Sequence, residues 1–311
     1  MSSVVAQDWT RDLRLGGLRR FAVAISVLTL LGHSWLGFET SWINPFVALA
    51  CGYTIELLLE WCHAYSTGRK ARFSGEGFSG LVHFLLPTHI TCLAISMLLY
   101  PNERLWPVAF AVAVAIGSKF VLRVGSNGKS KHYMNPSNLG IATTLVLFPW
   151  VGIAMPYQYT ENLSGLGDWV LPAIIICSGT FINYRYTKRL VLLSCWVLGF
   201  ALQAILRTIF FDASLVATLA PMTGMAFLLF TFYMLTDPAT SPFKQRSQIA
   251  FGLSVGIAYG IVTAMHIVFG FFFALVAVCT VRGLWLWFDS VSHGARDDIL
   301  NAGASVDAQG A

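Results

Sequence analysis

Residues 267–288 read IVFGFFFALVAVCTVRGLWLWF, an apolar run with a single charged side chain, Arg282. An α-helix rises 1.5 Å per residue, so a run of this length crosses the roughly 30 Å hydrocarbon core of a lipid bilayer. Nine further runs precede it, at 21–38, 44–64, 79–100, 106–124, 138–156, 169–183, 190–211, 214–235 and 248–265. The pattern predicts an all-α integral membrane protein with about ten transmembrane helices.

The bulk composition agrees with this class. Of the 311 residues, 56% are hydrophobic and 11% are charged, whereas a soluble domain carries roughly 25% charged residues. The net charge is only +5, and the basic residues do not gather on one face, so no nucleic-acid partner is expected. None of the six cysteines forms a CxxC pair, which argues against a disulfide framework or a cysteine-ligated zinc site.

Charge placement predicts the topology. When the ten runs alternate across the membrane, 16 of the 20 basic residues fall on one side, and only Arg104 falls in a loop on the other. Positively charged loops stay in the cytoplasm, so both termini are predicted there, in a bacterial inner membrane. We therefore divide the chain into a basic cytoplasmic segment (1–20), a membrane domain (21–288) and a polar tail (289–311) that we expect to be disordered.

Among the ionisable residues that fall inside predicted spans, three are the candidates for an ion path. Glu56 and Glu60 are four residues apart on one face of the second run, and Lys119 lies in the fourth. A charge at mid-bilayer costs about 3 kcal/mol, and such residues usually face the bundle interior or a water path. Two interpretations stay open. Either Glu56, Glu60 and Lys119 form a proton or cation path, or one glutamate pairs with Lys119 and fixes helix packing.

A transition metal and a haem are two cofactors that intramembrane carboxylates and histidines can bind. Glu56, Glu60 and a histidine would suit iron or manganese, but no Glu-x-x-His pair is present, and no metal site is predicted. A haem would need two histidines from different helices, for which His89 and His266 are the candidates. A lone intramembrane histidine is more often structural or interfacial.

Two loops carry proline-containing caps. Asn135 precedes Pro136 before the fifth run, and Asp237 precedes Pro238 after the eighth. A helix N-terminus offers free N–H groups and partial positive charge, so each loop would hold an anion or a cofactor phosphate. The alternative is that both are plain helix caps. The candidate cofactor-binding residues are Asn135, Ser137, Asn138, Thr236, Asp237 and Thr240.

The same two loops carry a family resemblance. Segments 132–140 (HYMNPSNLG) and 234–242 (MLTDPATSP) resemble the two signature segments of the RnfD/NqrB family. These are membrane subunits of the Rnf complex and of the sodium-pumping NADH:quinone oxidoreductase. The nearer likeness is to the UnbU-type branch found with enediyne biosynthesis clusters, to which segment 149–165 is also similar. The likeness covers roughly residues 10–290 and implies a ten-helix, urea-transporter-like bundle that carries flavin.

The resemblance also implies a site for that flavin. Typical members attach FMN through a phosphoester to the final threonine of a Ser/Thr-Gly-Ala-Thr motif on the outer side. Here the corresponding loop reads Ser164-Gly165-Leu166-Gly167, and Gly167 stands where the acceptor threonine would be. Glycine has no hydroxyl group, so covalent FMN is not expected. The flavin implied by the resemblance is FMN or riboflavin bound non-covalently.

The expected function follows from these observations taken together. The lead hypothesis is a membrane component of a redox or electron-transport system, in contact with the lipid bilayer and with other membrane or redox subunits. Its own role would be electron relay through flavin, coupled to cation or proton movement, and whether it is itself an enzyme stays open. The alternative is a channel or carrier for a small polar solute or a natural product on the same fold. A third hypothesis is a scaffold subunit that binds nothing.

Overall fold

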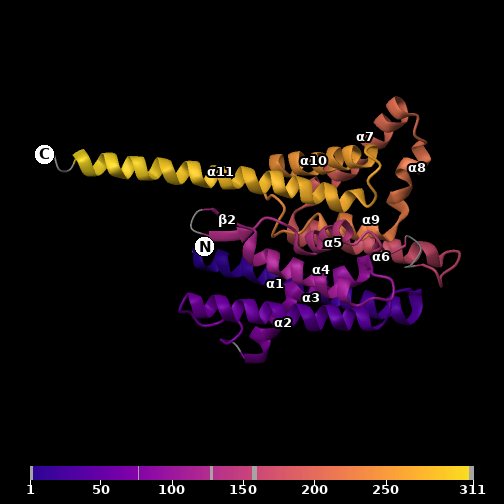
Figure 1. Cartoon of the computed structure of the whole chain (residues 1–311), viewed down its shortest axis with the longest axis horizontal. Coiled ribbons are helices and arrows are strands. Elements are labelled where there is room, and N and C mark those ends of the chain that lie inside the picture. Colours follow the sequence, from indigo (N-terminus) through magenta and orange to yellow (C-terminus); the bar gives the residue numbers. More distant parts are fainter. Residues whose placement is uncertain (1–2, 76, 127–128, 156–159, 308–311) are drawn as a thin grey trace.

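The computed structural model describes residues 3–75, 77–126, 129–155 and 160–307. It is a bundle of antiparallel helices (Figure 1), with α1 to α4 on one side, α7, α10 and α11 on the other, and α5 and α9 between them. The helices in chain order are α1 (Ser3–Leu31), α2 (Ile43–Ser66), α3 (Gly77–Leu98), α4 (Trp106–Val121), α5 (Pro136–Leu147), α6 (Gly167–Ile182), α7 (Leu190–Phe211), α8 (Leu215–Leu219), α9 (Met225–Leu229), α10 (Gln245–Ala264) and α11 (Gly270–Asp307).

Short π-helical or 3₁₀ turns and two small sheets join these helices. The turns are η1 (Gly32–Leu36), η2 (Asn183–Thr187), η3 (Ala220–Thr223) and η4 (Phe230–Met234). Strand β1 (Leu99–Tyr100) pairs antiparallel with β4 (Gly152–Ile153), and β2 (Arg123–Ser126) pairs antiparallel with β3 (Lys129–His132).

Within the described residues, six helices are long and apolar enough to cross a bilayer, namely 15–36, 43–66, 77–98, 190–211, 245–264 and 270–292. A seventh crossing is added if the pair 215–223 and 225–234, which is bent by 67°, is counted as one span. The chain therefore has the architecture of an all-α, multi-pass membrane protein. Judged by the length and composition of its helices, the structure gives six or seven crossings, fewer than the ten predicted from the sequence.

Two predicted spans are not continuous helices. The run 138–156 is helical only to Leu147, because Pro149 lacks an N–H group and disfavours helical geometry at Phe148. The run 214–235 breaks at Gly224, whose ψ of 140° is extended. In both places the residues stay hydrophobic where the helix ends, so the hydrophobic pattern did not predict the break.

The segment after residue 288, which the sequence predicts to be a disordered tail, is helical over part of its length. Helix α11 continues to Asp307, past residue 288, and Figure 1 shows it reaching well beyond the bundle. An existing helix adds residues far more readily than a new helix nucleates, so a strongly helical span extends into a polar segment.

The basic loops share one end of the bundle, which we call the basic end. It carries the α2–α3 loop with Arg69 and Arg72, the β2–β3 hairpin, and the segment from η2 to α7. The start of α1 and the end of α11 point the same way, toward the left of Figure 1. The β1–β4 pair lies at the opposite end.

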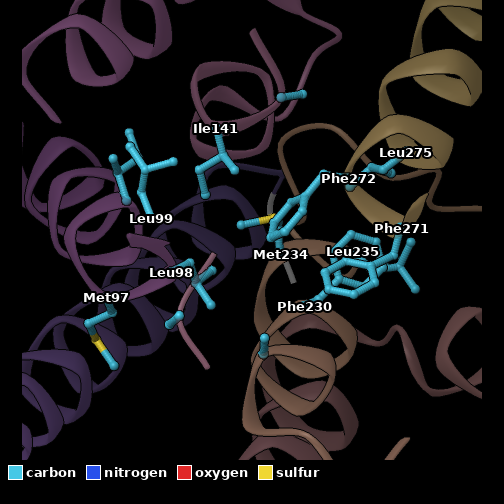
Figure 2. Close-up of a cluster of buried hydrophobic side chains, with 14 of the residues drawn as sticks. Met97, Leu98, Leu99, Ile141, Phe230, Met234, Leu235, Phe271, Phe272 and Leu275 are labelled. Atoms are coloured by element: carbon cyan, nitrogen blue, oxygen red, sulfur yellow. The ribbon is translucent and has the colours of Figure 1, made fainter. Parts of the chain in front are cut away.

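A hydrophobic core joins the two sides of the bundle (Figure 2). It forms where the end of α3 and β1 meet α5, η4 and the start of α11. The labelled side chains are Met97, Leu98, Leu99, Ile141, Phe230, Met234, Leu235, Phe271, Phe272 and Leu275. Such interiors pack as densely as organic crystals, so this core fixes how the sides meet.

Glycines allow α7 and α10 to pack backbone to backbone. A Cβ atom added at Gly256 would lie 2.8 Å from the main-chain carbon of Gly199. One added at Gly252 would lie 2.7 Å from the main-chain oxygen of Leu192. Small residues at helix interfaces are the usual device for close packing where lipid gives no hydrophobic driving force.

Candidate functional site

A cavity of about 1230 Å³ lies between the two sides of the bundle. It is lined by α1, α3 and α6 along its length, and by the ends of α4, α5 and η4 near the basic end. It brings together residues that the sequence placed in two separate groups, namely Glu56, Lys119, Asn135, Ser137, Thr236 and Asp237. The other predicted residues, Glu60, Asn138 and Thr240, do not line it.

Asn135 joins α5 to its neighbours. Its Oδ1 accepts from the backbone N of Asn138 at 3.0 Å and from Ser137 Oγ at 2.9 Å. Its Nδ2 donates to the main-chain oxygen of Met234 at 3.0 Å, and Asn138 Nδ2 donates to that of Phe272 at 2.9 Å. These bonds match the plain-cap alternative for the side chains, and they pin α5 to η4 and α11.

Asp237 closes a turn rather than a helix. Its Oδ1 accepts from the backbone N of Ala239 and its Oδ2 from Thr240 Oγ1, each at 3.1 Å. Ser241 Oγ donates to its main-chain oxygen at 2.7 Å. The sequence predicted a helix start here, but α10 begins only at Gln245. The reason is Pro242, which disfavours helical geometry at Ser241.

Arg189 anchors this turn from the side of α7. Its Nε donates to Ser241 Oγ at 2.8 Å, and the side chain is buried. Burial lowers the pKa of the Arg189 guanidinium below its usual value, an effect that the nearby Asp237 carboxylate opposes. Thr236 Oγ1 donates to a main-chain oxygen one turn back at 2.6 Å. The polar atoms of the turn are therefore committed to holding its shape.

Glu56 and Lys119 form a buried ion pair. Lys119 Nζ lies 2.8 Å from Glu56 Oε2, and Thr88 Oγ1 donates to the same oxygen at 2.9 Å. Lys119 Nζ also donates to Thr88 Oγ1 at 2.9 Å, which closes a triangle between α2, α3 and α4. This geometry corresponds to the packing alternative, because each charge has its counter-charge and a hydrogen-bond partner.

Glu60 has different partners. Arg69 Nη1 lies 2.6 Å from its Oε1, and Arg72 Nη2 lies 2.7 Å from its Oε2. The Arg72 backbone N and Nε each add a bond of 2.9 Å. The hydrogen bond to Glu60 raises the pKa of Arg69 above its usual value. Sequence reasoning considered only Lys119 as a partner, because it assigned the two arginines to a loop without seeing that the loop folds back over the helix end.

Six cationic side chains line the cavity: Arg72, Lys119, Arg123, Arg185, Lys188 and Arg189. Four of them donate to acceptors of the protein, which are Glu60, Glu56, Ser130 and Ser241. Within the part of the chain that the structure describes, the side chains of Arg185 and Lys188 have no hydrogen-bond acceptor. Lys188 Nζ lies 5.3 Å from the Tyr184 ring. From the sequence, these two cations served only to predict which side of the membrane their loop lies on.

Aromatic side chains cross the cavity. The rings of Phe21 on α1 and Tyr233 on η4 are stacked, with centroids 4.7 Å apart and planes 6° apart. The Tyr233 hydroxyl lies 3.0 Å from Ser178 Oγ on α6. Away from the basic end, the wall consists mostly of apolar side chains from α1, α3 and α6, with the hydroxyl groups of Thr91 and Ser178 among them. The cavity is thus cationic at one end and apolar along the rest.

The residues considered for metal and haem are placed otherwise. Both ring nitrogens of His89 are engaged, Nδ1 with Tyr53 Oη at 2.6 Å and Nε2 with Ser26 Oγ at 2.7 Å. This leaves no nitrogen of His89 for haem iron. The described residues contain no group of three or more His, Cys, Asp or Glu that would hold a metal ion.

No protein-family model and no curated protein sequence matches the chain. What the fold establishes is the class, a multi-pass helical membrane protein with a large internal cavity.

Proposed function

We propose that this chain is a membrane component of an electron-transport system and that it holds FMN non-covalently in the cavity. The observation that carries the proposal is the single cavity into which both resemblance-bearing segments and the uncommitted cations Arg185 and Lys188 face. A phosphate suits two cations without a counter-charge. The isoalloxazine ring suits a wall that includes Phe21, Tyr186 and Tyr233.

The proposed fold is a ten-helix bundle of the RnfD/NqrB type. Six long helices and the bent pair give up to seven crossings, and the proposal assigns the remaining three to the shorter α4, α5 and α6. An even count agrees with the start of α1 and the end of α11 pointing the same way (Figure 1). The proposed location is a bacterial inner membrane with the basic end in the cytoplasm. Other redox subunits would then meet the protein at either membrane face.

The proposed coupling to cation or proton movement rests on Glu56. Its carboxylate borders the cavity, so a change of charge on a bound flavin would act on the Glu56–Lys119 pair across a medium of low dielectric. Glu60 lies outside the cavity wall and is held by two arginines. Any ion path through this region would therefore use Glu56 rather than both glutamates.

The test is the visible absorption spectrum of the protein purified from membranes, followed by acid extraction and chromatography of the released chromophore. A flavin spectrum with extractable FMN is the expected result. Replacing Arg185 and Lys188 together with Gln should weaken FMN binding at least tenfold, since hydrogen bonds to charged groups contribute about 1.5–3 kcal/mol each. The matched control is Arg246→Gln, an exposed basic-end arginine that does not line the cavity.

A chromophore-free protein that also fails to bind added FMN would contradict the flavin proposal. The second candidate function, a carrier for an amphiphilic natural product, would then lead. One observation favours it independently: apolar side chains of α1 and α6 that line the cavity, such as Val27 and Ile174, are exposed. Transport of such a compound into vesicles by the purified protein would distinguish it from electron relay.

A further inference from the structure

The cavity opens sideways between α1 and α6. Val27 and Leu31 of α1 and Ile174 of α6 line it, yet they are 49%, 39% and 56% exposed. All three are apolar; Val27 and Ile174 lie well inside α1 and α6, and Leu31 is the last residue of α1. In a bilayer, side chains at such positions would meet acyl chains. An opening with such a rim admits hydrocarbon and disfavours water.

An apolar channel connects this opening to the cationic end. Leu28, Ala94 and Ile175 line it on three different helices. On the way, α1 touches the other side of the bundle through Arg20, whose guanidinium lies 5.0 Å from the Tyr186 ring. Near the basic end α1 therefore covers part of the channel, whereas the exposed rim residues lie farther along α1 and α6.

The positive and negative charges at the cationic end of the cavity are not balanced. The two carboxylates that line the cavity are Glu56, which is paired with Lys119, and Asp237, whose two oxygens accept from its own turn. Arg185 and Lys188 thus face the cavity without an anion from the described part of the protein. A ligand that complements the whole cavity carries an anionic head and a hydrocarbon tail.

We propose that an anionic membrane phospholipid occupies the cavity of the flavin-free protein. Its phosphate lies against Arg185 and Lys188, and an acyl chain leaves between α1 and α6 past Ile174. Because the FMN phosphate would need the same two cations, FMN and the lipid exclude one another. The lipid site rests on the cavity and its charges, so it stands whether or not the redox role does.

The experiment uses the full chain in phosphatidylcholine nanodiscs that contain a small fraction of phosphatidic acid bearing a diazirine in its acyl chain. Irradiation followed by peptide mass spectrometry locates the crosslinks. Labelling is expected on cavity-lining peptides of α1, α3 and α6. The headgroup control is phosphatidylcholine with the same diazirine chain, which should label these peptides about tenfold less.

Two pairs of variants separate the parts of the proposal. Ile174→Trp should block the opening and reduce labelling inside the cavity, whereas Ile176→Trp, exposed on the same helix but outside the cavity, should leave it unchanged. Arg185→Gln combined with Lys188→Gln should abolish the preference for phosphatidic acid, and Arg246→Gln should keep it. These positions have exposed side chains, so folding is preserved.

Equal cavity labelling by the two lipids would overturn the headgroup assignment, and labelling indifferent to Ile174→Trp would overturn the route. FMN that binds without lowering the labelling would overturn the shared site. The outcomes also separate the two proposals. A protein that binds FMN but shows no phosphatidic acid labelling after its flavin is removed defeats only the lipid site, and a protein that binds no FMN but is labelled defeats only the redox role.

Discussion

At the scale of single residues, the two glutamates on one face of α2 have different partners. Glu56 meets a lysine and a threonine inside the bundle, and Glu60 meets two arginines from a loop. The side chains of these arginines, Arg69 and Arg72, are 32% and 59% exposed. Glu56 therefore has partners that cannot return to water, whereas Glu60 has partners that can.

Replacing Glu56 with Gln should destabilise the protein strongly. The change leaves Lys119 buried without a counter-charge, and removing one partner of a buried pair costs about 3–5 kcal/mol in the free energy of unfolding. Thermal unfolding in detergent would measure the loss. Glu60→Gln serves as the comparison and should cost less, since its arginines can turn toward solvent.

A second change tests the cause. Combining Glu56→Gln with Lys119→Met removes both charges and should restore most of the lost stability, because no unpaired ion then remains. If Glu56→Gln alone is as stable as the unmodified protein, the pair is not structural. An ion-conducting role would then be the better account of Glu56.

Because residue 167 is a glycine, we expect no flavin to be attached covalently to the protein. Gly167 is the first residue of α6 and offers no hydroxyl group for a phosphoester. Denatured protein on a gel should therefore show no flavin fluorescence at its band, even where the native protein contains FMN. A fluorescent band would point to a hydroxyl acceptor elsewhere, such as Thr160 in the same loop.

At the scale of elements, the glycine contact between α7 and α10 sets how closely two helices approach. Gly256→Ala should destabilise the protein, since the added methyl group would lie 2.8 Å from the backbone of Gly199. Overpacking of this kind typically costs about 1–3 kcal/mol. The matched control is Gly117→Ala in α4, where the new methyl group meets nothing within 4 Å.

Thermal unfolding of both alanine variants would check this. Gly117→Ala should be neutral or slightly stabilising, since alanine favours helix by about 0.5–1 kcal/mol relative to glycine. Equal effects of the two changes would mean that α7 and α10 pack less closely than the structure has them.

At the scale of the whole molecule, the basic end should lie in the cytoplasm, and both termini with it. Reporter fusions at Ser3 and Ala311 would measure this. The physical reason is the retention of Lys- and Arg-rich loops on the inner side. A periplasmic signal from one terminus would mean an odd number of crossings, and the ten-helix proposal would then be wrong.

The sequence by itself determined the class of this protein. Runs such as 190–211 and 267–288 are too apolar and too long for any other surroundings, and this property depends only on local composition. The cap at Asn135 was also readable, since a cap is made within one turn of chain. The breaks at Phe148 and Gly224 were less visible, because the hydrophobic run continued through them.

Only the tertiary structure decided what the site residues meet. Asn135 and Asp237 are 102 positions apart by number, yet they line one cavity with Glu56 and Lys119. The partners of Glu60 come from a folded-back loop, and Arg185 and Lys188 stand out only because the other four cations that line the cavity have acceptors in the protein. The contribution of a charged side chain to stability depends on its distance from the nearest counter-charge and from water. Contacts between distant segments of the chain set both distances.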